Sequence, residues 1–219
     1  MSLALSCTKS KIVEIVDRQL EFFGLDATVE PYVDDAFDRM EVAFKKITNK
    51  YYHFGGGTAY FSASHSGQYM QLLYYLSRFA FLDGKIEMAD NLFSLNKMLN
   101  AIDLFYEVEL TGAFFTDHPM GCVLGRAIYN DCFAFSNGCV IGGNHDVYPV
   151  IGKNVEMHAM SMIVGNSHIG NNVEISAFAF VRDTDIPDNS IVFGQSPHLS
   201  IVTKNSDYMK ERLRQFKYE

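Results

Sequence analysis

The sequence predicts an α+β chain in sequence order, with an N-terminal α-helical domain, a parallel β-helix of hexapeptide repeats and a short C-terminal helix. From Ile151 onward, an aliphatic or Met side chain returns at every sixth position, at Ile151, Met157, Ile163, Ile169, Ile175 and Val181. A period of six fits neither an α-helix, which repeats near 3.6, nor a plain strand, which repeats at 2. It fits short strands joined by tight bends, in which every sixth side chain points toward one axis.

The first hundred residues carry apolar side chains at helical spacing, and we expect helices at 11–23, 32–47, 67–82 and 86–104. The third segment is apolar on nearly all sides, so it is expected to be buried or to lie in an oligomer interface. Near Tyr106, helix formers give way to Val, Phe, Cys, Gly and Asn. We therefore predict a helical domain at 1–105, a β-helix at 106–203 and a helical tail at 204–219.

The period of six is interrupted once in this reading. Ile141 and Ile151 are ten residues apart, so four residues are expected to leave the coil as a loop within residues 142–149. A loop extruded from a strict repeat is usually functional. Counting back in sixes from Ile141 predicts Phe135, Tyr129 and Val123 at the axis of the earlier coils.

Composition excludes several classes of function. The formal net charge is −8 and the pI about 5.3, without a basic stripe, so nucleic acid is not an expected partner. The sequence shows neither a targeting presequence nor an apolar run of 18 residues, which predicts a soluble, cytoplasmic chain with no membrane partner. No metal-ligand spacing occurs. The cysteines lack CxxC spacing and are expected to be free thiols, at Cys7, Cys122, Cys132 and Cys139.

Several short motifs occur in a fixed order, namely Phe114-Phe115-Thr116-Asp117-His118-Pro119-Met120-Gly121, Val123-Leu124-Gly125, Val140-Ile141-Gly142-Gly143, Pro149-Val150-Ile151-Gly152 and Gly194-Gln195-Ser196-Pro197. Over about residues 114–197 this order resembles the serine acetyltransferase family, which has an all-helical domain before a left-handed parallel β-helix. The resemblance implies acetyl transfer from acetyl-CoA to a hydroxyl group. It also implies a homotrimer with active sites between neighbouring β-helices, and pairing of trimers through the helical domain is compatible with the apolar third helix.

The resemblance assigns the general base to His118, in the Asp-His-x-x-Gly element. His is the side chain that titrates near neutral pH, as removal of a hydroxyl proton requires. The alternative is a surface histidine without chemistry. An acidic partner usually orients such a base, and the candidates are Asp117, Glu107 and Glu109. Adjacent strand residues face opposite sides, so Asp117 is expected to point at the acceptor or a neighbouring turn. Either glutamate is equally well explained as a solvated carboxylate.

The predicted loop supplies the candidate acceptor-binding residues His145, Asp146 and Tyr148. The family has an Arg-His-Pro step that contacts serine, where this chain has Val147-Tyr148-Pro149. We therefore favour a hydroxyl acceptor other than serine, such as a sugar or glycan unit. The alternatives are a genuine serine O-acetyltransferase of cysteine biosynthesis and a non-catalytic β-helix scaffold. An Asn-His-Asp sequence that only forms a turn also remains an explanation for His145.

Acetyl-CoA, as co-substrate, is expected along the groove between adjacent β-helices, as the resemblance implies. A backbone amide near Gly142-Gly143 is the candidate for stabilising the oxyanion. Small residues at these turns are also required by the fold itself. The candidate acetyl-CoA positions are Gly142, Gly143, Ala159, Gly165, Ala177, Gln195, Ser196, Pro197 and Lys204.

Overall fold

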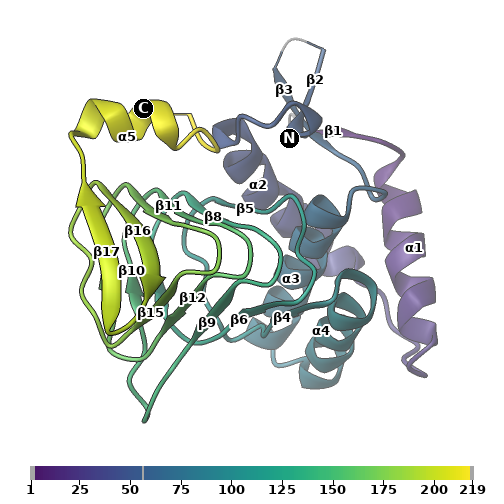
Figure 1. Cartoon of the computed structure of the whole chain (residues 1–219). Coiled ribbons are helices and arrows are strands. Elements are labelled where there is room, and N and C mark those ends of the chain that lie inside the picture. Colours follow the sequence, from purple (N-terminus) through teal and green to yellow (C-terminus); the bar gives the residue numbers. More distant parts are fainter. Residues whose placement is uncertain (1–2, 56, 218–219) are drawn as a thin grey trace. The chain divides into compact units, whose positions relative to one another are not determined.

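The computed structural model describes residues 3–55 and 57–217 (Figure 1). The chain divides into two compact units, which are described separately. The first comprises residues 1–45 and 49–107, and the second comprises residues 46–48 and 108–219.

The first unit is mainly helical. Its helices are α1 (Lys9–Glu21), most of α2 (Glu30–Lys46), α3 (Ser66–Leu82) and α4 (Ile86–Asn100). Short elements accompany them, namely β1 (Ala4–Leu5), η1 (Lys50–Tyr52), β2 (His53–Phe54), β3 (Thr58–Phe61) and β4 (Ile102–Leu104). Thr8 caps α1 by accepting a hydrogen bond from the backbone N–H of Lys11. Of the two alternatives expected for the third helix, burial holds for residues Gly67 to Ser77 of α3, which are all buried, whereas Leu82 at its end is 63% exposed.

The second unit is a parallel β-helix of about five turns, which confirms the predicted fold class. Its strands form three faces that we call A, B and C. Face A contains β5 (Phe114–Phe115), β8 (Phe133–Phe135), β11 (Val155–Met157), β14 (Val173–Ile175) and β16 (Ser190–Gln195). Face B contains β6 (Cys122–Leu124), β9 (Val140–Gly142), β12 (Met162–Val164) and β15 (Phe180–Arg182). Face C contains β7 (Ile128–Tyr129), β10 (Val150–Ile151) and β13 (His168–Ile169).

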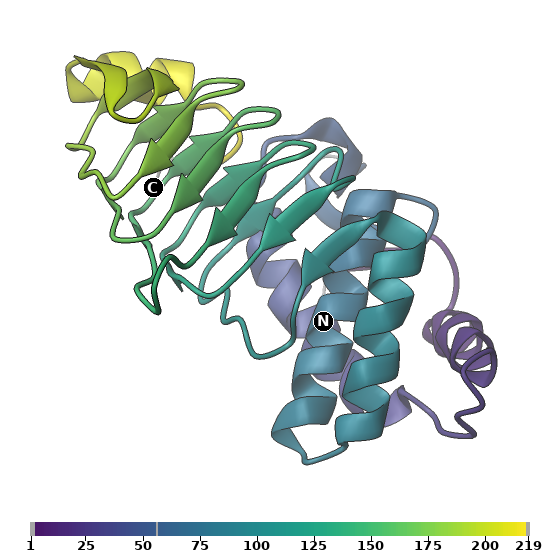
Figure 2. The same ribbon diagram turned by 60° about the horizontal axis from the view of Figure 1, so that its bottom comes forward.

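The predicted axis residues fill the interior of the coils. The six positions from Ile151 to Val181 are all buried, and Ile151 pairs with Ile169 at an 18-residue step. Figure 2 shows the strands of successive coils stacked in parallel. At the corner between faces C and A, Asn154, Asn172 and Asn189 adopt positive φ. The Asn154 side-chain amide donates a hydrogen bond of 3.0 Å to the Asn172 side chain, and the Asn172 amide donates one of 3.0 Å to the Asn189 side chain. Asn tolerates this backbone conformation better than most residues do, which explains its recurrence there.

One axis position was predicted wrongly. Tyr129 and Phe135 are buried as expected, but Val123 is 40% exposed and the neighbouring Leu124 is 1% exposed. Leu124 pairs with Ile141, so the step between these coils is 17 residues rather than 18. The first coil also has two extra residues, because Phe115 and Val123 are eight positions apart while their partners Ala134 and Val140 are six positions apart. Counting back from Ile141 in strict sixes ignores the short step between these coils, so the predicted axis position falls on Val123, one residue before the buried Leu124.

The C-terminal segment returns along the β-helix. Strand β17 (His198–Thr203) pairs antiparallel with β16, and α5 (Ser206–Arg212) follows, within the predicted tail helix. Met209 and Leu213 form a buried cluster with Ile191, and Arg212 forms an ion pair with Glu174 of face A. The tail therefore packs on its own β-helix. Residues 218–219, at the end of the predicted helical tail 204–219, lie outside the described residues. Within the described ranges, no helix has both the length and the apolar character needed to cross a membrane.

Candidate active site

His118 lies at the corner between faces A and B of the first coil, between β5 and β6. Gly138 donates its backbone N–H to Met120 O at 2.9 Å, so the first coil is back in register with the second at Met120. The two extra residues of the first coil therefore lie in this corner, before Met120. His118 and Asp117 are exposed, whereas Thr116 is fully buried. The structure therefore extrudes the predicted base from the coil on a short outward bend.

Asp117 faces the outer side of face A. It lines a small pocket with Phe115, Ser136, Glu156 and Gln215. Gln215 of the C-terminal segment donates a hydrogen bond of 3.1 Å to Glu156. Burial raises the pKa of the Glu156 carboxyl above its usual range. The environment of Asp117 is thus built partly by the tail, a neighbour that the sequence did not indicate.

The two other predicted acids are exposed, but their positions differ. Val108 and Leu110 are buried while Glu107 and Glu109 are exposed, as in an alternating strand. Leu110 forms a bridge with Tyr129, which places Glu109 beside face C rather than at the corner of His118 in the same chain. Glu107 belongs to the first unit. Their roles as orienting acids stay predictions.

The loop between β9 and β10 is extruded where the sequence predicted it, at the corner between faces B and C (Figure 1). Asn144 and Val147 exchange backbone hydrogen bonds of 2.9 and 3.1 Å, and His145 and Asp146 between them have φ of 49° and 59°. Positive φ at both central residues defines a tight type I′ hairpin turn. The turn expected as an alternative role for His145 is therefore present, and the hairpin presents His145 and Asp146 to solvent.

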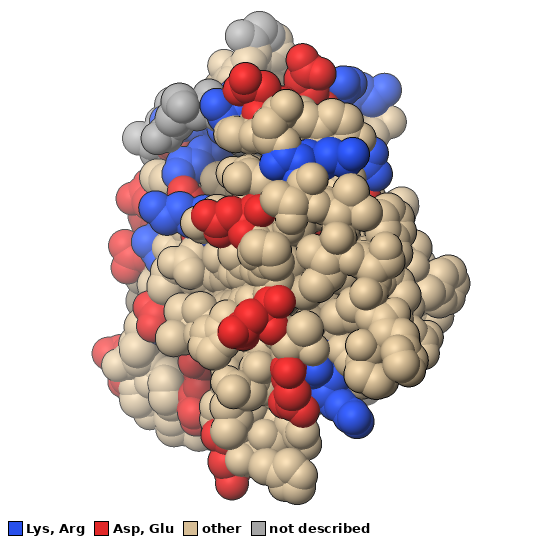
Figure 3. Space-filling view, turned by 60° about the vertical axis from the view of Figure 1, so that its left-hand side comes forward, with Lys and Arg blue, Asp and Glu red and all other residues tan. Residues whose placement is uncertain are grey.

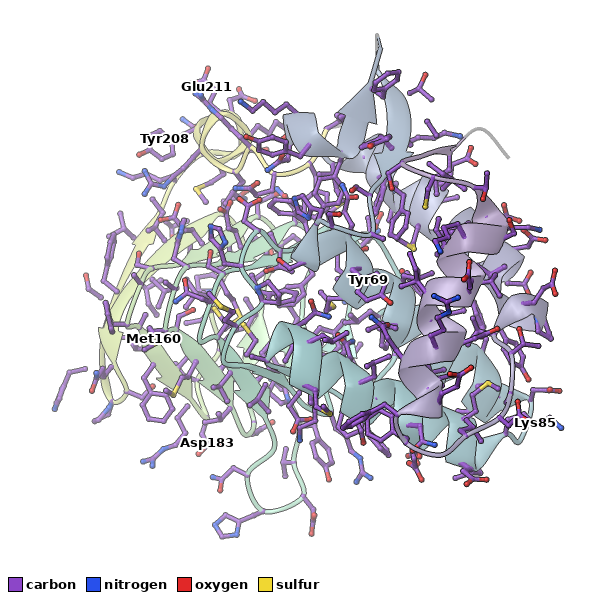
Figure 4. The ribbon with its side chains drawn as sticks, turned by 90° about the vertical axis from the view of Figure 1, so that its right-hand side faces the viewer. Tyr69, Lys85, Met160, Asp183, Tyr208 and Glu211 are labelled. Carbon is purple, nitrogen blue, oxygen red and sulfur yellow. The ribbon has the colours of Figure 1, made fainter. Side chains whose placement is uncertain are left out.

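Two contacts fix the base of this loop. The Tyr148 ring lies over Gly143, where an added Cβ would be 2.6 Å from the ring. The Asn144 side chain donates a hydrogen bond of 3.3 Å to Asp183 Oδ2, two coils further on. Asp183 Oδ1 accepts the Asn166 backbone N–H at 2.8 Å. Met160 and Asp183, labelled in Figure 4, both lie on the outer surface of the β-helix.

His118 and the loop lie on opposite edges of face B. The outward side chains along this face include Val123, Val140, Met162 and Phe180, and the exposed Arg182 at the end of β15. Met160, Met162, Phe178 and Phe180 line a groove with Gln195, and Phe178 is 67% exposed. Figure 3 shows a broad surface area without Lys, Arg, Asp or Glu. Within one chain, face B separates the predicted base from the predicted acceptor loop.

Arg126 is a residue that the sequence reasoning missed. It is exposed in the corner between β6 and β7, at the same edge of face B as the loop and one coil earlier. The pairing of β6 with β9 and of β7 with β10 brings it there. Hydrophobic periodicity could have located this corner only if the short step between Leu124 and Tyr129 had been recognised.

The candidate acetyl-CoA residues fall into three groups. Gly142, Gly143 and Gly165 lie at the edge of face B that carries the loop, whereas Ala159 and Ala177 lie at the edge of His118. Gln195 pairs with Phe180 on face B, and Ser196 and Pro197 form the adjoining β16–β17 turn. Lys204 instead donates its backbone N–H to Asn189 O at the corner between faces C and A, and its ammonium lies over Tyr208. Among the described residues, no group of His, Cys, Asp and Glu has the arrangement of a metal site.

Together, the coils, the outward bend at His118 and the extruded loop define a hexapeptide-repeat β-helix with two departures from the repeat. No family model matches the chain. Serine acetyltransferase from Synechococcus elongatus is 32% identical over 105 residues, which are 46% of this chain and 43% of that protein. One from Staphylococcus epidermidis is 30% identical over 110 residues, 48% of this chain and 51% of that protein. The β-helix thus has serine acetyltransferase homologues, which confirms the resemblance predicted from sequence.

Solved structures agree with this relationship. Serine O-acetyltransferase from Brucella melitensis has a TM-score of 0.58 and 25% identity, covering 65% of this chain and 57% of that chain. The Neisseria gonorrhoeae enzyme in complex with serine has a TM-score of 0.55 and 25% identity, covering 64% and 58%. Serine acetyltransferase from Brucella abortus in complex with coenzyme A, at 21% identity and a TM-score of 0.57, shares the fold over 65% and 58%. This chain spans about half the length of the curated relatives it matches.

Proposed function

We propose that the chain is an acetyl-CoA-dependent O-acetyltransferase. One observation carries the proposal. The first two coils depart from the repeat by gaining residues at two corners, and those corners hold His118 and the loop. The homologues are serine acetyltransferases, and a related fold is solved with coenzyme A, which supports acetyl-CoA as the donor.

In the proposed mechanism, the acceptor hydroxyl attacks the thioester carbonyl of acetyl-CoA directly. His118 takes the hydroxyl proton as the new oxygen–carbon bond forms. A backbone amide near Gly142-Gly143 stabilises the oxyanion of the tetrahedral intermediate. Collapse of the intermediate breaks the carbon–sulfur bond, and the proton held by His118 goes to the departing thiolate. No covalent acetyl-enzyme forms, so no cysteine has a role.

We further propose that the site is completed between copies of the chain in a homotrimer. His118 and the loop lie on opposite edges of face B, so neighbours that meet along this face bring the His118 corner of one copy to the loop corner of the next. The exposed Met and Phe side chains of face B support this contact, because large apolar patches mark association surfaces. Pairing of trimers through the helical unit remains part of the proposal.

Serine is the first acceptor to test, because the homologues are named for it. A sugar hydroxyl is the second candidate, because Val147-Tyr148 replaces the Arg-His step implied by the family resemblance. A non-catalytic scaffold would bind no acetyl-CoA.

The test is release of free thiol from acetyl-CoA with a panel of serine, homoserine, sugars and nucleotide sugars. Wild-type protein is compared with His118→Ala and with His168→Ala, an exposed histidine on face C that serves as a matched control. We expect His118→Ala to lower kcat by roughly 10²- to 10⁴-fold, with acetyl-CoA binding unchanged, and His168→Ala to behave as wild type. Near-normal turnover by His118→Ala would exclude it as the base.

A further inference from the structure

A pocket of about 230 Å³ opens at the corner between faces C and A of the β-helix. This corner is opposite face B, along which copies of the chain are proposed to meet. All residues that line the pocket belong to the second unit, and the charged ones are Lys46, Asp131, Lys153 and Lys217. Three ammonium groups and one carboxylate leave a surplus of two positive charges, in a chain whose formal net charge is −8. The pocket is therefore a local cationic site on an acidic protein.

The carboxylate of Asp131 is engaged by the fold itself. Its Oδ2 accepts a hydrogen bond of 2.6 Å from Lys46 Nζ. Its Oδ1 accepts the backbone N–H groups of Ala113 at 2.8 Å and of Cys132 at 3.0 Å. Burial opposes ionisation of this carboxyl, but these hydrogen bonds hold its pKa below the usual range. Asp131 is thus a carboxylate whose charge is matched by Lys46.

Lys153 and Lys217 provide the surplus charge. Among the residues that the structure describes, no carboxylate lies within ion-pair distance of either ammonium group. Both residues are exposed, so their ammonium groups are hydrated and accessible at the pocket. Cations that line one cavity repel each other, and an anion bound between them replaces this repulsion with attraction.

The shape of the pocket comes from the asparagine ladder at this corner. Cys132 occupies the position that Asn154 and Asn172 occupy in the next two coils, and it has the same backbone conformation, with φ of 64°. The Cys side chain is smaller than that of Asn, which leaves room for the pocket at this rung. Phe216, only 4% exposed, adds an apolar wall.

Three segments that are distant in sequence meet at the pocket. Lys217 of the tail donates its backbone N–H to Lys46 O at 2.7 Å, and Phe216 forms a β-bridge with Ile47. Lys153 comes from the corner of the second coil, directly before Asn154. A ligand held by Lys153 and Lys217 would therefore join the end of the tail to the β-helix.

We propose that this pocket binds a phosphate group, either free or carried as a monoester on a small molecule, with Lys153 and Lys217 as its cationic ligands. A phosphate monoester carries a charge of about −1.5 to −2 at pH 7, which matches the surplus of two positive charges. Lysine is a common phosphate ligand. Phe216 offers an apolar contact to the organic part of a monoester. The site does not depend on the proposed acetyltransferase function.

Modification of Cys132 by iodoacetamide, an uncharged reagent, reports occupancy of the pocket, because this thiol is partly exposed in the lining. Inorganic phosphate and phenyl phosphate should slow the modification, with half-protection at or below about 1 mM. Chloride at matched ionic strength should not slow it. Cys7, partly exposed in the first unit, is the internal control and should react at an unchanged rate. Tighter binding of phenyl phosphate would identify a monoester as the ligand, tighter binding of inorganic phosphate would identify free phosphate, and both support the site.

A matched pair of double variants tests the two lysines. Lys153→Gln combined with Lys217→Gln should weaken protection of Cys132 about 10- to 100-fold, the effect of losing hydrogen bonds to charged groups. Lys85→Gln combined with Lys210→Gln removes the same charge from exposed positions outside the pocket lining and should keep wild-type protection. Hydrogen–deuterium exchange of residues 213–217 gives a readout that does not use the thiol. Phosphate should slow this exchange in wild type and not in the Lys153→Gln, Lys217→Gln variant.

Unchanged modification of Cys132 and unchanged exchange of the tail with both phosphates would overturn the proposal. Equal protection by chloride would overturn it as well, because it would reflect ionic strength. Equal protection by succinate would reject a phosphate site in favour of a general site for dianions. Equal loss of protection in the two double variants would show that overall charge, and not this pocket, determines binding.

Discussion

Replacing Arg212 with Ala is expected to loosen α5 from face A of the β-helix. Arg212 Nη2 donates a hydrogen bond of 2.8 Å to Glu174 Oε1, and Nε bonds the other carboxylate oxygen. Glu174 is only 4% exposed. His158 Nε2 lies 3.6 Å from the same carboxylate. The substitution would therefore leave a buried carboxylate with His158 as its remaining charged partner among these three.

The size of the effect follows from the pKa of Glu174. Burial opposes its ionisation, but the hydrogen bonds with His158 and Arg212 outweigh burial and lower the pKa from 4.5 to about 2. A lowering of this size corresponds to roughly 3 kcal/mol at neutral pH. Two partners share it, and the Arg212 side chain is 39% exposed, so solvent screens part of its interaction. We therefore expect a loss of roughly 1–2 kcal/mol, about a 5- to 30-fold increase in opening of α5.

Hydrogen–deuterium exchange of peptides covering residues 205–217 measures this opening directly. The Lys210→Ala variant is the matched control, since Lys210 is a cation on the same helix. Its Nζ lies 3.8 Å from Oδ1 of Asp207, an exposed carboxylate. It should leave the exchange unchanged. Faster exchange in both variants would reflect loss of helix charge in general, and unchanged exchange in Arg212→Ala would refute the anchor.

The anchor also predicts a pH dependence. The pKa of Glu174 is lowered by folding, so its contribution is complete above pH 4.5 and is lost as the pH falls toward about 2. The nearby Glu174 raises the pKa of His158 above 6.5, so its contribution is complete below pH 6.5 and is lost as the pH rises through the raised value. Protection of α5 should therefore be greatest between about pH 4.5 and 6.5. A steady increase in protection up to pH 9 would contradict this.

Two further substitutions test the corner that holds the loop. Gly165→Ala should lower the free energy of unfolding by about 1–3 kcal/mol, because Gly165 has φ +71° and an added Cβ would lie 2.1 Å from Asp183 Oδ1. Gly142→Ala, where nothing lies within 4 Å of the added Cβ, is the thermal-unfolding control, and equal effects would argue against the contact. Asp183→Ala should speed proteolysis of the loop several-fold, as loss of a hydrogen bond to a charged group implies, with the melting temperature of the β-helix nearly unchanged. A loop that stays equally resistant would show that Asn144 needs no anchor.

Hydrophobic periodicity predicted the β-helix and the main loop because interior side chains must recur wherever the coil is regular. It failed at Val123 because the coil is irregular there. The step from Leu124 to Tyr129 is one residue short, the corner at His118 is two residues long, and Val123 and Leu124 are both aliphatic. Periodicity alone does not reveal which corner of one coil stacks on which corner of the next.

The candidate site was predictable only as separate parts. The resemblance identified His118 and the loop, but Arg126 came into view once β6 was paired with β9 and β7 with β10. The position of Glu109 beside face C depends on its bridge neighbour Leu110, a contact between residues that are distant in sequence. The tail docks on face A because Met209 and Leu213 are buried there. The sequence of a short charged helix does not show which surface its few apolar side chains contact.

The separation of His118 and the loop by the width of face B has a kinetic consequence. If each site takes one corner from each of two copies, a single chain holds no complete catalytic unit. The rate per chain would then fall on dilution, with a lag while copies reassociate after dilution is reversed. Turnover numbers measured at low protein concentration would report the assembly equilibrium together with the chemistry.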